Sequence, residues 1–199
     1  MKRNTYKHNN YWISPVEDFT IFRGFSCLAP EDGDRDLDDF IHHDAQRHNA
    51  DRMAVTYQFT YKERAVGRSL ISHLIGFATL QNDAITFDPA DETVQALGYP
   101  YKSYPAVKIG RMGIKRQLQR KYLGTLFIFM LKQFFLQANR TGCRFLTVDA
   151  RVDEANNVNV IPFYEKNGFH PFITDDERAY KAMYFDLKSG IYLPVEYRS

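Results

Sequence analysis

The pattern of hydrophobic and polar positions predicts a chain in which strands and helices are mixed. Residues 55–61 and 70–80 combine β-branched and aromatic side chains, which is typical of two strands joined by a hairpin-like loop. Residues 106–114 indicate a further strand. Gly110 and Gly113 interrupt it, which suggests a bulge or a close approach of other backbone. These segments predict a central sheet.

The second half of the chain carries its most apolar stretch. Residues 123–139 predict a largely buried helix, and Gly142 follows it as a helix end. The remaining predicted elements are a short buried strand, a short helix that stops at Asn167-Gly168, and two closing strands, at residues 145–148, 158–166, 169–173 and 179–187.

The N-terminal third is less regular. Residues 1–12 indicate a loose leader, because their polar positions precede any apolar run, and residues 19–27 indicate a first strand. A helix is expected from Leu37 onward, with Asp34 or Asp36 as its N-cap. Together the elements predict one α/β or α+β domain over residues 1–199.

Composition limits the classes of protein that fit. Hydrophobic residues make up 44% and charged residues 25%, so the chain can build a core and is not disordered throughout. With 26 basic and 24 acidic residues the net charge of +2 does not indicate a nucleic-acid coat. Cys27 and Cys143 alone cannot form a disulfide framework or a four-cysteine zinc site.

The sequence also gives expectations about the location of the protein and about metal binding. No signal peptide is visible, and the apolar run 123–136 is shorter than the ~20 residues of a membrane span. We therefore expect a cytoplasmic protein that does not contact a membrane. His42, His43 and His48 lack the three- or four-residue spacing of ligands on one helix face, so no metal site is expected.

The segment that carries chemistry lies between residues 108 and 125, where a strand leads through a basic loop into the apolar helix. A helix N-terminus binds phosphate through its open N–H groups, and Gly124 would let a ligand approach the first turn. The sequence thus predicts a diphosphate or polyphosphate site, although such a loop can also be a solvated surface. The cations of the segment are Lys108, Arg111, Lys115, Arg116, Arg120 and Lys121.

Three further motifs point to one superfamily. They are Phe145-Leu146-Thr147-Val148-Asp149-Ala150, Asn156-Asn157 and Phe163-Tyr164-Glu165-Lys166-Asn167-Gly168-Phe169. With the loop Gln119-Arg120-Lys121-Tyr122-Leu123-Gly124, they resemble the GNAT superfamily of N-acetyltransferases, whose loop reads Gln/Arg-x-x-Gly-x-Gly/Ala. The resemblance covers residues 53–187. Within the superfamily, the chain looks most like the bacterial branch that includes toxin-type acetyltransferases.

The resemblance implies a fold and a co-substrate site. The fold would be a mostly antiparallel sheet of six to seven strands, with helices on both faces and a V-shaped split between two parallel strands. Acetyl-CoA would lie in that split, within residues 105–169. The residues implied to bind it are Met112, Gly113, Ile114, Gln119, Arg120, Lys121, Tyr122, Leu123, Gly124, Thr125 and Asn157.

The resemblance also implies the chemistry. An amine would attack the thioester directly, and Tyr164 would protonate the departing CoA thiolate as a general acid. Two of the residues have a second interpretation: Tyr164 could simply pack beside other aromatics, and Asn157 could be a plain helix N-cap. The general base is not assigned, with Asp149 as one candidate.

One position departs from the superfamily pattern. Tyr122 stands where the loop has its first glycine, and its ring would either crowd the diphosphate or point outward. The leading hypothesis is acetyl transfer to a primary amine of unknown identity. The alternatives are toxin-type acetylation of aminoacyl-tRNA, which would make nucleic acid a partner, and an acyl-CoA-binding module without catalysis. A homodimer is possible.

Overall fold

The computed structural model describes residues 5–28, 35–64, 69–87, 96–99, 101–138, 141–156, 158–172 and 180–190. Its strands are β1 (Tyr6–His8), β2 (Tyr11–Pro15), β3 (Val55–Arg64), β4 (Leu70–Ile85), β5 (Tyr104–Ile114), β6 (Phe145–Asp153), β7 (Val158–Asn159), β8 (His170–Pro171) and β9 (Tyr180–Asp186). Its α-helices are α1 (Asp36–Asp39), α2 (Ala45–Ala50), α4 (Leu123–Ala138) and α5 (Ile161–Lys166). The shorter helical turns are η1 (Phe19–Phe22), η2 (Phe40–Asp44, a π-helical turn), η3 (Arg116–Leu118) and η4 (Glu154–Asn156).

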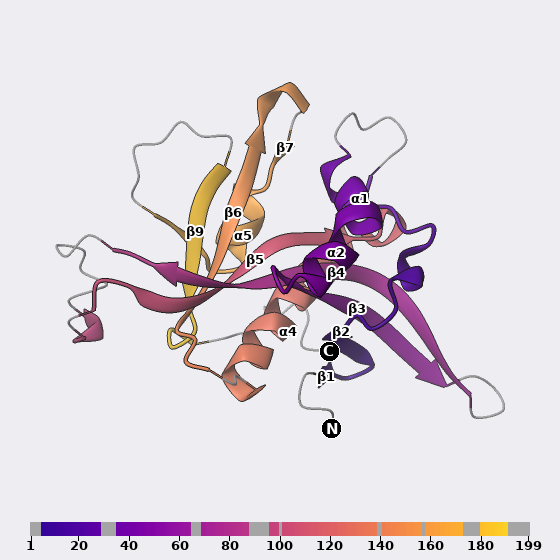
Figure 1. Ribbon diagram of the computed structural model, residues 1–199, viewed down its shortest axis with the longest axis horizontal. Coiled ribbons are helices and arrows are strands. Elements are labelled where there is room, and N and C mark those ends of the chain that lie inside the picture. The colour runs from indigo at the N-terminus through magenta and orange to yellow at the C-terminus, as the bar shows by residue number, and fades with distance from the viewer. Residues whose placement is uncertain are drawn as a thin grey trace.

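One sheet organises the structure. Its strand order is β1-β2-β3-β4-β5-β6-β9-β8, and β7 pairs with the far end of β6. Every pairing is antiparallel except that of β5 with β6. Figure 1 shows the strands crossing the molecule, with α4 beneath them and α1 and α2 above. The mixed, mostly antiparallel sheet predicted from the sequence is confirmed.

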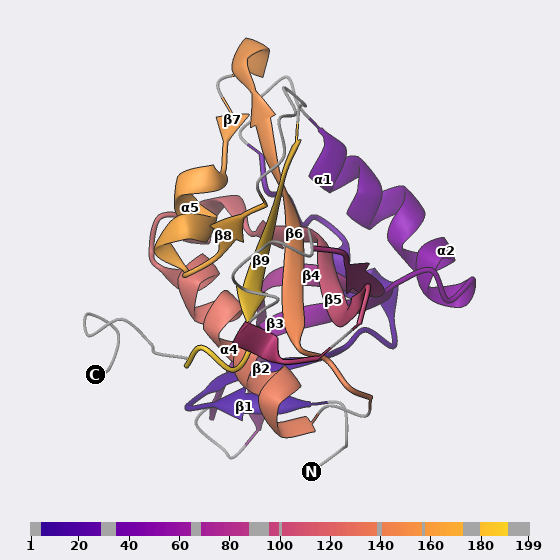
Figure 2. The ribbon, with the colours of Figure 1, turned by 90° about the vertical axis from the view of Figure 1, so that its left-hand side faces the viewer.

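Helices cover both faces of the sheet, as expected. On one face α4 packs on β3, where the rings of Phe127 and Phe59 stack at 4.6 Å between centroids. On the other face Phe22 of η1 meets Phe77 of β4 edge to face, at 5.8 Å. Figure 2 shows the sheet between these layers, with α1 and α2 on one side and α4 and α5 on the other. Each face therefore has its own hydrophobic core.

The prediction of a loose leader over residues 1–12 is wrong for the residues described. β1 and β2 form a hairpin whose turn contains Asn9, with a positive φ of 52° that asparagine tolerates better than most residues. Ile13 is fully buried opposite Phe59 of β3. The hairpin and the short strands β7 and β8 bring the sheet to nine strands, more than the six to seven expected.

The predicted strand at residues 19–27 is also wrong. Asp18 accepts hydrogen bonds from the backbone N and Oγ1 of Thr20, at 2.9 and 2.7 Å, and so begins η1 instead. Phe22, Phe25 and Cys27 are buried against the sheet without belonging to it. Their apolar side chains reflect packing on Phe77, not strand formation.

Candidate active site

β5 and β6 pair over only part of their length. Their parallel register runs from Ala106 opposite Phe145 to Ile109 opposite Val148. Beyond this point β5 stays paired with β4 as far as Ile114, whereas β6 stays paired with β9. The strands therefore separate in a V, and their different directions are visible in Figure 1. The predicted split between two parallel strands is confirmed.

A β-bulge marks the point of separation. Leu80 of β4 pairs with Ile109, but Thr79 pairs with Arg111, so Gly110 has no partner opposite it. The Arg111 N–H donates to Oγ1 of Thr79 at 2.9 Å, and a Cβ added at Gly110 would lie 3.3 Å from the same oxygen. The bulge suggested by Gly110 in the sequence is confirmed, and it turns β5 away from β6.

The end of β5 has one paired edge and one edge that faces the split. The Lys115 N–H donates to the Ile75 carbonyl at 2.8 Å, so residue 115 points toward β4. Because backbone groups alternate in direction along a strand, Gly113 also faces β4, whereas Met112 and Ile114 face the split. Of the three residues predicted to contact the pantetheine arm, Met112 and Ile114 thus present backbone groups to the split, and Gly113 does not.

Gln119 braces the loop that follows β5. Its Nε2 donates to the carbonyl of Cys27 at 2.6 Å and to that of Ile114 at 3.0 Å. Gly113 permits this close approach of the Cys27 segment, because a Cβ at Gly113 would collide with the Cys27 Sγ. The side chain of Gln119 therefore fixes the loop from inside, and its backbone N–H donates to the Arg116 carbonyl at 3.2 Å.

Two residues of the loop adopt the left-handed conformation that favours glycine. Arg120 has φ 57° and Tyr122 has φ 61°. The Tyr122 side chain is 55% exposed, and the Nζ of Lys166 lies 5.6 Å from its ring centroid. The ring thus points outward, toward α5. Tyr122 thus adopts a backbone conformation that glycine favours, with its ring outside the turn.

The first turn of α4 follows directly. The Leu126 N–H donates to the Tyr122 carbonyl, so Leu123, Gly124 and Thr125 are the residues whose amides have no acceptor within the helix. A Cβ at Gly124 would lie 3.3 Å from two ring carbons of Phe163 in α5. Gly124 therefore lets α5 approach the first turn of α4 closely.

The six predicted cations divide into two groups. Lys108 forms an ion pair with Asp149 at 2.5 Å, and Arg111 pairs with Asp36 at 3.3 Å, on the face that carries α1. The other group precedes the first turn of α4 in the sequence. Its members are Lys115, Arg116, Arg120 and Lys121, and Lys166 of α5 joins them beside Tyr122.

Tyr164 lies on α5, next to the residue that contacts Gly124. Its ring packs edge to face against Phe163 and Phe169, at 5.1 and 5.4 Å. Burial raises the pKa of its hydroxyl to about 12, because an apolar environment disfavours the phenolate. Among the described residues, none accepts or donates a hydrogen bond at this hydroxyl. The packing and the acid interpretations of Tyr164 are thus compatible.

For two of the predicted residues, the structure adds no support for a role at the site. Asp149 lies within β6, not at its end, and its carboxylate is held by Lys108, so the general base stays unassigned. Asn157 lies outside the described residues.

The sequence analysis missed two buried charged residues. Asp38 accepts hydrogen bonds from Oγ of Ser26 and from the Cys27 N–H, at 2.5 and 2.8 Å, and so ties α1 to the Cys27 segment that Gln119 contacts. Lys132 is buried on α4. Asp38 belongs to an acidic stretch whose sequence is typical of a solvated surface, so the sequence gives no sign of its burial. Lys132 does carry a signal, because it is a charged residue within an apolar run.

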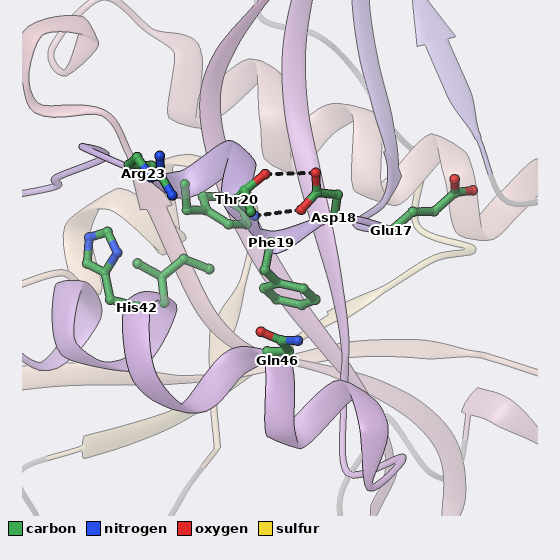
Figure 3. A pocket seen from close by; sticks show the side chains of 9 residues that line it. Glu17, Asp18, Phe19, Thr20, Arg23, His42 and Gln46 are labelled. Carbon is green, nitrogen blue, oxygen red and sulfur yellow. Dashed lines mark hydrogen bonds between the residues drawn. The ribbon is translucent and has the colours of Figure 1, made fainter.

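Surface pockets adjoin the start of α4 and the turn η1. One, of about 460 Å³, adjoins the start of α4 and is lined by Tyr11, Tyr61, His73, Leu74, Ile75, Lys115, Gln117, Leu118 and Leu123. The other, of about 440 Å³, lies between η1 on one side and η2 and α2 on the other, and contains none of the predicted site residues. Figure 3 shows Asp18, Thr20, Arg23, His42 and Gln46 around it.

Three or more His, Cys, Asp or Glu side chains do not gather into a metal-binding group within the described ranges. In the same residues, no helix is both long and apolar enough to cross a membrane.

Comparison with known proteins identifies the fold. No protein-family profile and no curated sequence matches the chain. A tyrosine-to-phenylalanine variant of KacT superposes with a TM-score of 0.65 at 19% identity, over 91% of this chain and 97% of that one. A tyrosine-to-phenylalanine variant of the toxin AtaT gives 0.65 at 20%, over 92% and 93%. AtaT complexed with acetyl-methionyl-tRNAfMet gives 0.61 at 22%, over 90% and 96%. The chain therefore has the fold of KacT and AtaT, and the GNAT-like architecture expected from its sequence is confirmed.

Proposed function

We propose that this protein is an N-acetyltransferase that moves an acetyl group from acetyl-CoA to a primary amine. The observation that carries the proposal is the separation of β5 from β6 at the Gly110 bulge, followed by a basic loop that leads into the N-terminus of α4. A diphosphate at that turn would leave an attached thioester arm free to run along the open edge of β5.

The first turn of α4 fits the diphosphate of acetyl-CoA. The amides of Leu123, Gly124 and Thr125 point out of the helix at the positive end of its dipole. Arg120 and Lys121 are exposed beside them and add charge-assisted contacts. The outward ring of Tyr122 supports this fit, because the side chain leaves the turn itself open.

The open edge of β5 would hold the pantetheine arm. Met112 and Ile114 face the split, so their backbone groups can pair with the amides of the arm as an added strand would. The Ile114 carbonyl already accepts one hydrogen bond from Gln119, which leaves its second lone pair for the ligand. The Met112 N–H would polarise the thioester carbonyl as negative charge develops on its oxygen.

Tyr164 would act as the general acid. The attacking nitrogen forms a bond to the acetyl carbon, the carbon–sulfur bond breaks, and the thiolate takes the phenolic proton. Water carries away the proton lost by the nitrogen and restores the phenol. The pKa of about 12 supports this role, because it keeps the hydroxyl protonated at pH 7.

A second candidate narrows the acceptor to the amino group of aminoacyl-tRNA. It is favoured by one comparison: AtaT, which shares this fold, is known in complex with acetyl-methionyl-tRNAfMet. AtaT is also known with its antitoxin AtaR and acetyl-CoA. In this chain the exposed cations by α4 would then contact RNA phosphates as well, so activity would fall steeply as salt rises.

Release of free thiol from acetyl-CoA tests the proposal. We expect release with an added amine and only slow release without one. Aminoacyl-tRNA, deacylated tRNA and small primary amines should be compared at two salt concentrations. Release with aminoacyl-tRNA alone selects the second candidate. Calorimetric binding of acetyl-CoA without release by any of these acceptors would instead support a binding module that lacks catalysis.

A further inference from the structure

Lys132 is a charged residue in the middle of the core helix α4. It is 5% exposed and follows buried Ile128 by one helical turn, so it lies on the stripe that faces the sheet. Among the residues that the structure describes, no carboxylate pairs with it. Desolvation lowers its pKa to about 7. Because an apolar residue would cost less here, the buried amino group of Lys132 is expected to have a role.

The surroundings of the Lys132 Nζ are a helix end and two rings. It donates a hydrogen bond to the backbone carbonyl of Asn167, the C-cap of α5. It lies 3.3 Å from the ring centroid of Phe185 and 5.0 Å from that of Phe169. A cation is favoured both at the carbonyl end of a helix and above aromatic rings.

The contacts of Lys132 with Asn167 and with Phe169 both connect it to Tyr164. The Tyr164 carbonyl accepts hydrogen bonds from the N–H groups of Asn167 and Phe169, each at 3.0 Å. The Tyr164 ring also packs against Phe169, and the Lys132 Nζ lies 5.0 Å from the centroid of the Phe169 ring. The helix α5 has only six residues, too few to be stable without support from its surroundings.

We propose that Lys132 is a positioning residue that fixes the direction of the Tyr164 hydroxyl by holding the carbonyl end of α5 from inside the core. This rests on the proposed function, in which Tyr164 is the general acid. Lys132 acts through Asn167 and Phe169, and loss of its amino group leaves the phenol present but poorly oriented. A small error in the position of a reacting group is enough to slow a reaction severalfold.

Kinetics of Lys132→Met test the proposal, since methionine is of similar length and keeps the packing without the donor. We expect kcat to fall about 10-fold while KM for acetyl-CoA changes less than about 2-fold. In a Tyr164→Phe background the same change should cost little more, because both substitutions remove one function. The matched control is Phe134→Leu, a core change on α4 that faces Tyr57 of β3.

Hydrogen exchange supplies a readout that does not need activity. Lys132→Met should speed exchange of the Asn167 and Phe169 amides at least about 10-fold and leave β3 unchanged. Unchanged exchange there, or a kcat equal to that of wild type, overturns the proposal. If wild type transfers no acetyl group, the proposed function fails, and the exchange result still decides whether Lys132 holds Tyr164 in place.

Discussion

Gly124 in the first turn of α4 lies directly against the ring of Phe163 in α5. A Cβ at Gly124 would be 3.3 Å from two carbons of that ring, closer than most real contacts. We expect Gly124→Ala to push Phe163 outward and to shift the neighbouring Tyr164. Acetyl-CoA affinity and kcat should both fall, each by about 10-fold, because a small displacement affects the diphosphate turn and the acid together.

Gly142→Ala is the matched control for this change, since nothing lies within 4 Å of a Cβ at Gly142. Calorimetry and steady-state kinetics measure the two effects. Wild-type affinity and turnover in Gly124→Ala would show that the contact between α4 and α5 has no part in function.

The Tyr122 backbone adopts the left-handed conformation that favours glycine, and its ring points outward. Replacement by glycine should relieve left-handed strain of about 1 kcal/mol. It should change the Kd for acetyl-CoA by less than about 3-fold, because the exposed ring is not in the diphosphate turn. Isothermal calorimetry on Tyr122→Gly makes the measurement. A gain of 10-fold or more in affinity would mean that the ring obstructs the site.

Gln119 braces the loop through the carbonyls of Cys27 and Ile114. Gln119→Ala leaves both acceptors without this donor, which should cost about 1–3 kcal/mol in the free energy of unfolding. Acetyl-CoA affinity should fall because the loop loses its fixed form. Gln117→Ala, at an exposed position two residues earlier, is the control. Equal stability and affinity in both variants would exclude the brace.

Tyr164→Phe should lower kcat about 100-fold with little change in acetyl-CoA affinity. Since the phenol pKa is about 12, the rate for wild type should not decline between pH 7 and 10 through loss of this proton. Tyr6→Phe is the control, because burial also raises the pKa of Tyr6, on the edge strand β1. Turnover of Tyr164→Phe equal to that of wild type removes the residue from the mechanism.

Lys132 should make stability depend on pH. Its pKa is lowered from 10.5 to about 7 in the folded state, so between these values the unfolded chain binds a proton that the folded chain lacks. The free energy of unfolding should therefore rise with pH in this window, by at most about 1.4 kcal/mol per unit. Urea denaturation from pH 7 to 9 measures it. If the free energy of unfolding of Lys132→Met rises equally with pH, the pH dependence does not come from Lys132.

Much of the site could be predicted because its signals are local. The glycine at position 110 indicated the bulge, and the basic turn before an apolar run marked the start of α4. The positions of Met112 and Ile114 on the open edge of β5 then follow from strand alternation.

What could not be predicted depends on contacts between distant residues. The apolar residues at 19–27 suggested a strand, but the cap at Asp18 and burial on Phe77 decide their form. Likewise, Lys132 differs from a surface lysine only through Asn167 and Phe185, which lie in other elements. A single sequence carries no signal for such partners.

A crystal structure with acetyl-CoA bound tests the central claim most directly. We predict that the diphosphate lies on the amides of Leu123, Gly124 and Thr125, and that the thioester lies in the split between β5 and β6 with its sulfur near the Tyr164 hydroxyl. A diphosphate bound away from this turn, or a split closed to the thioester, would contradict the proposed acetyl transfer.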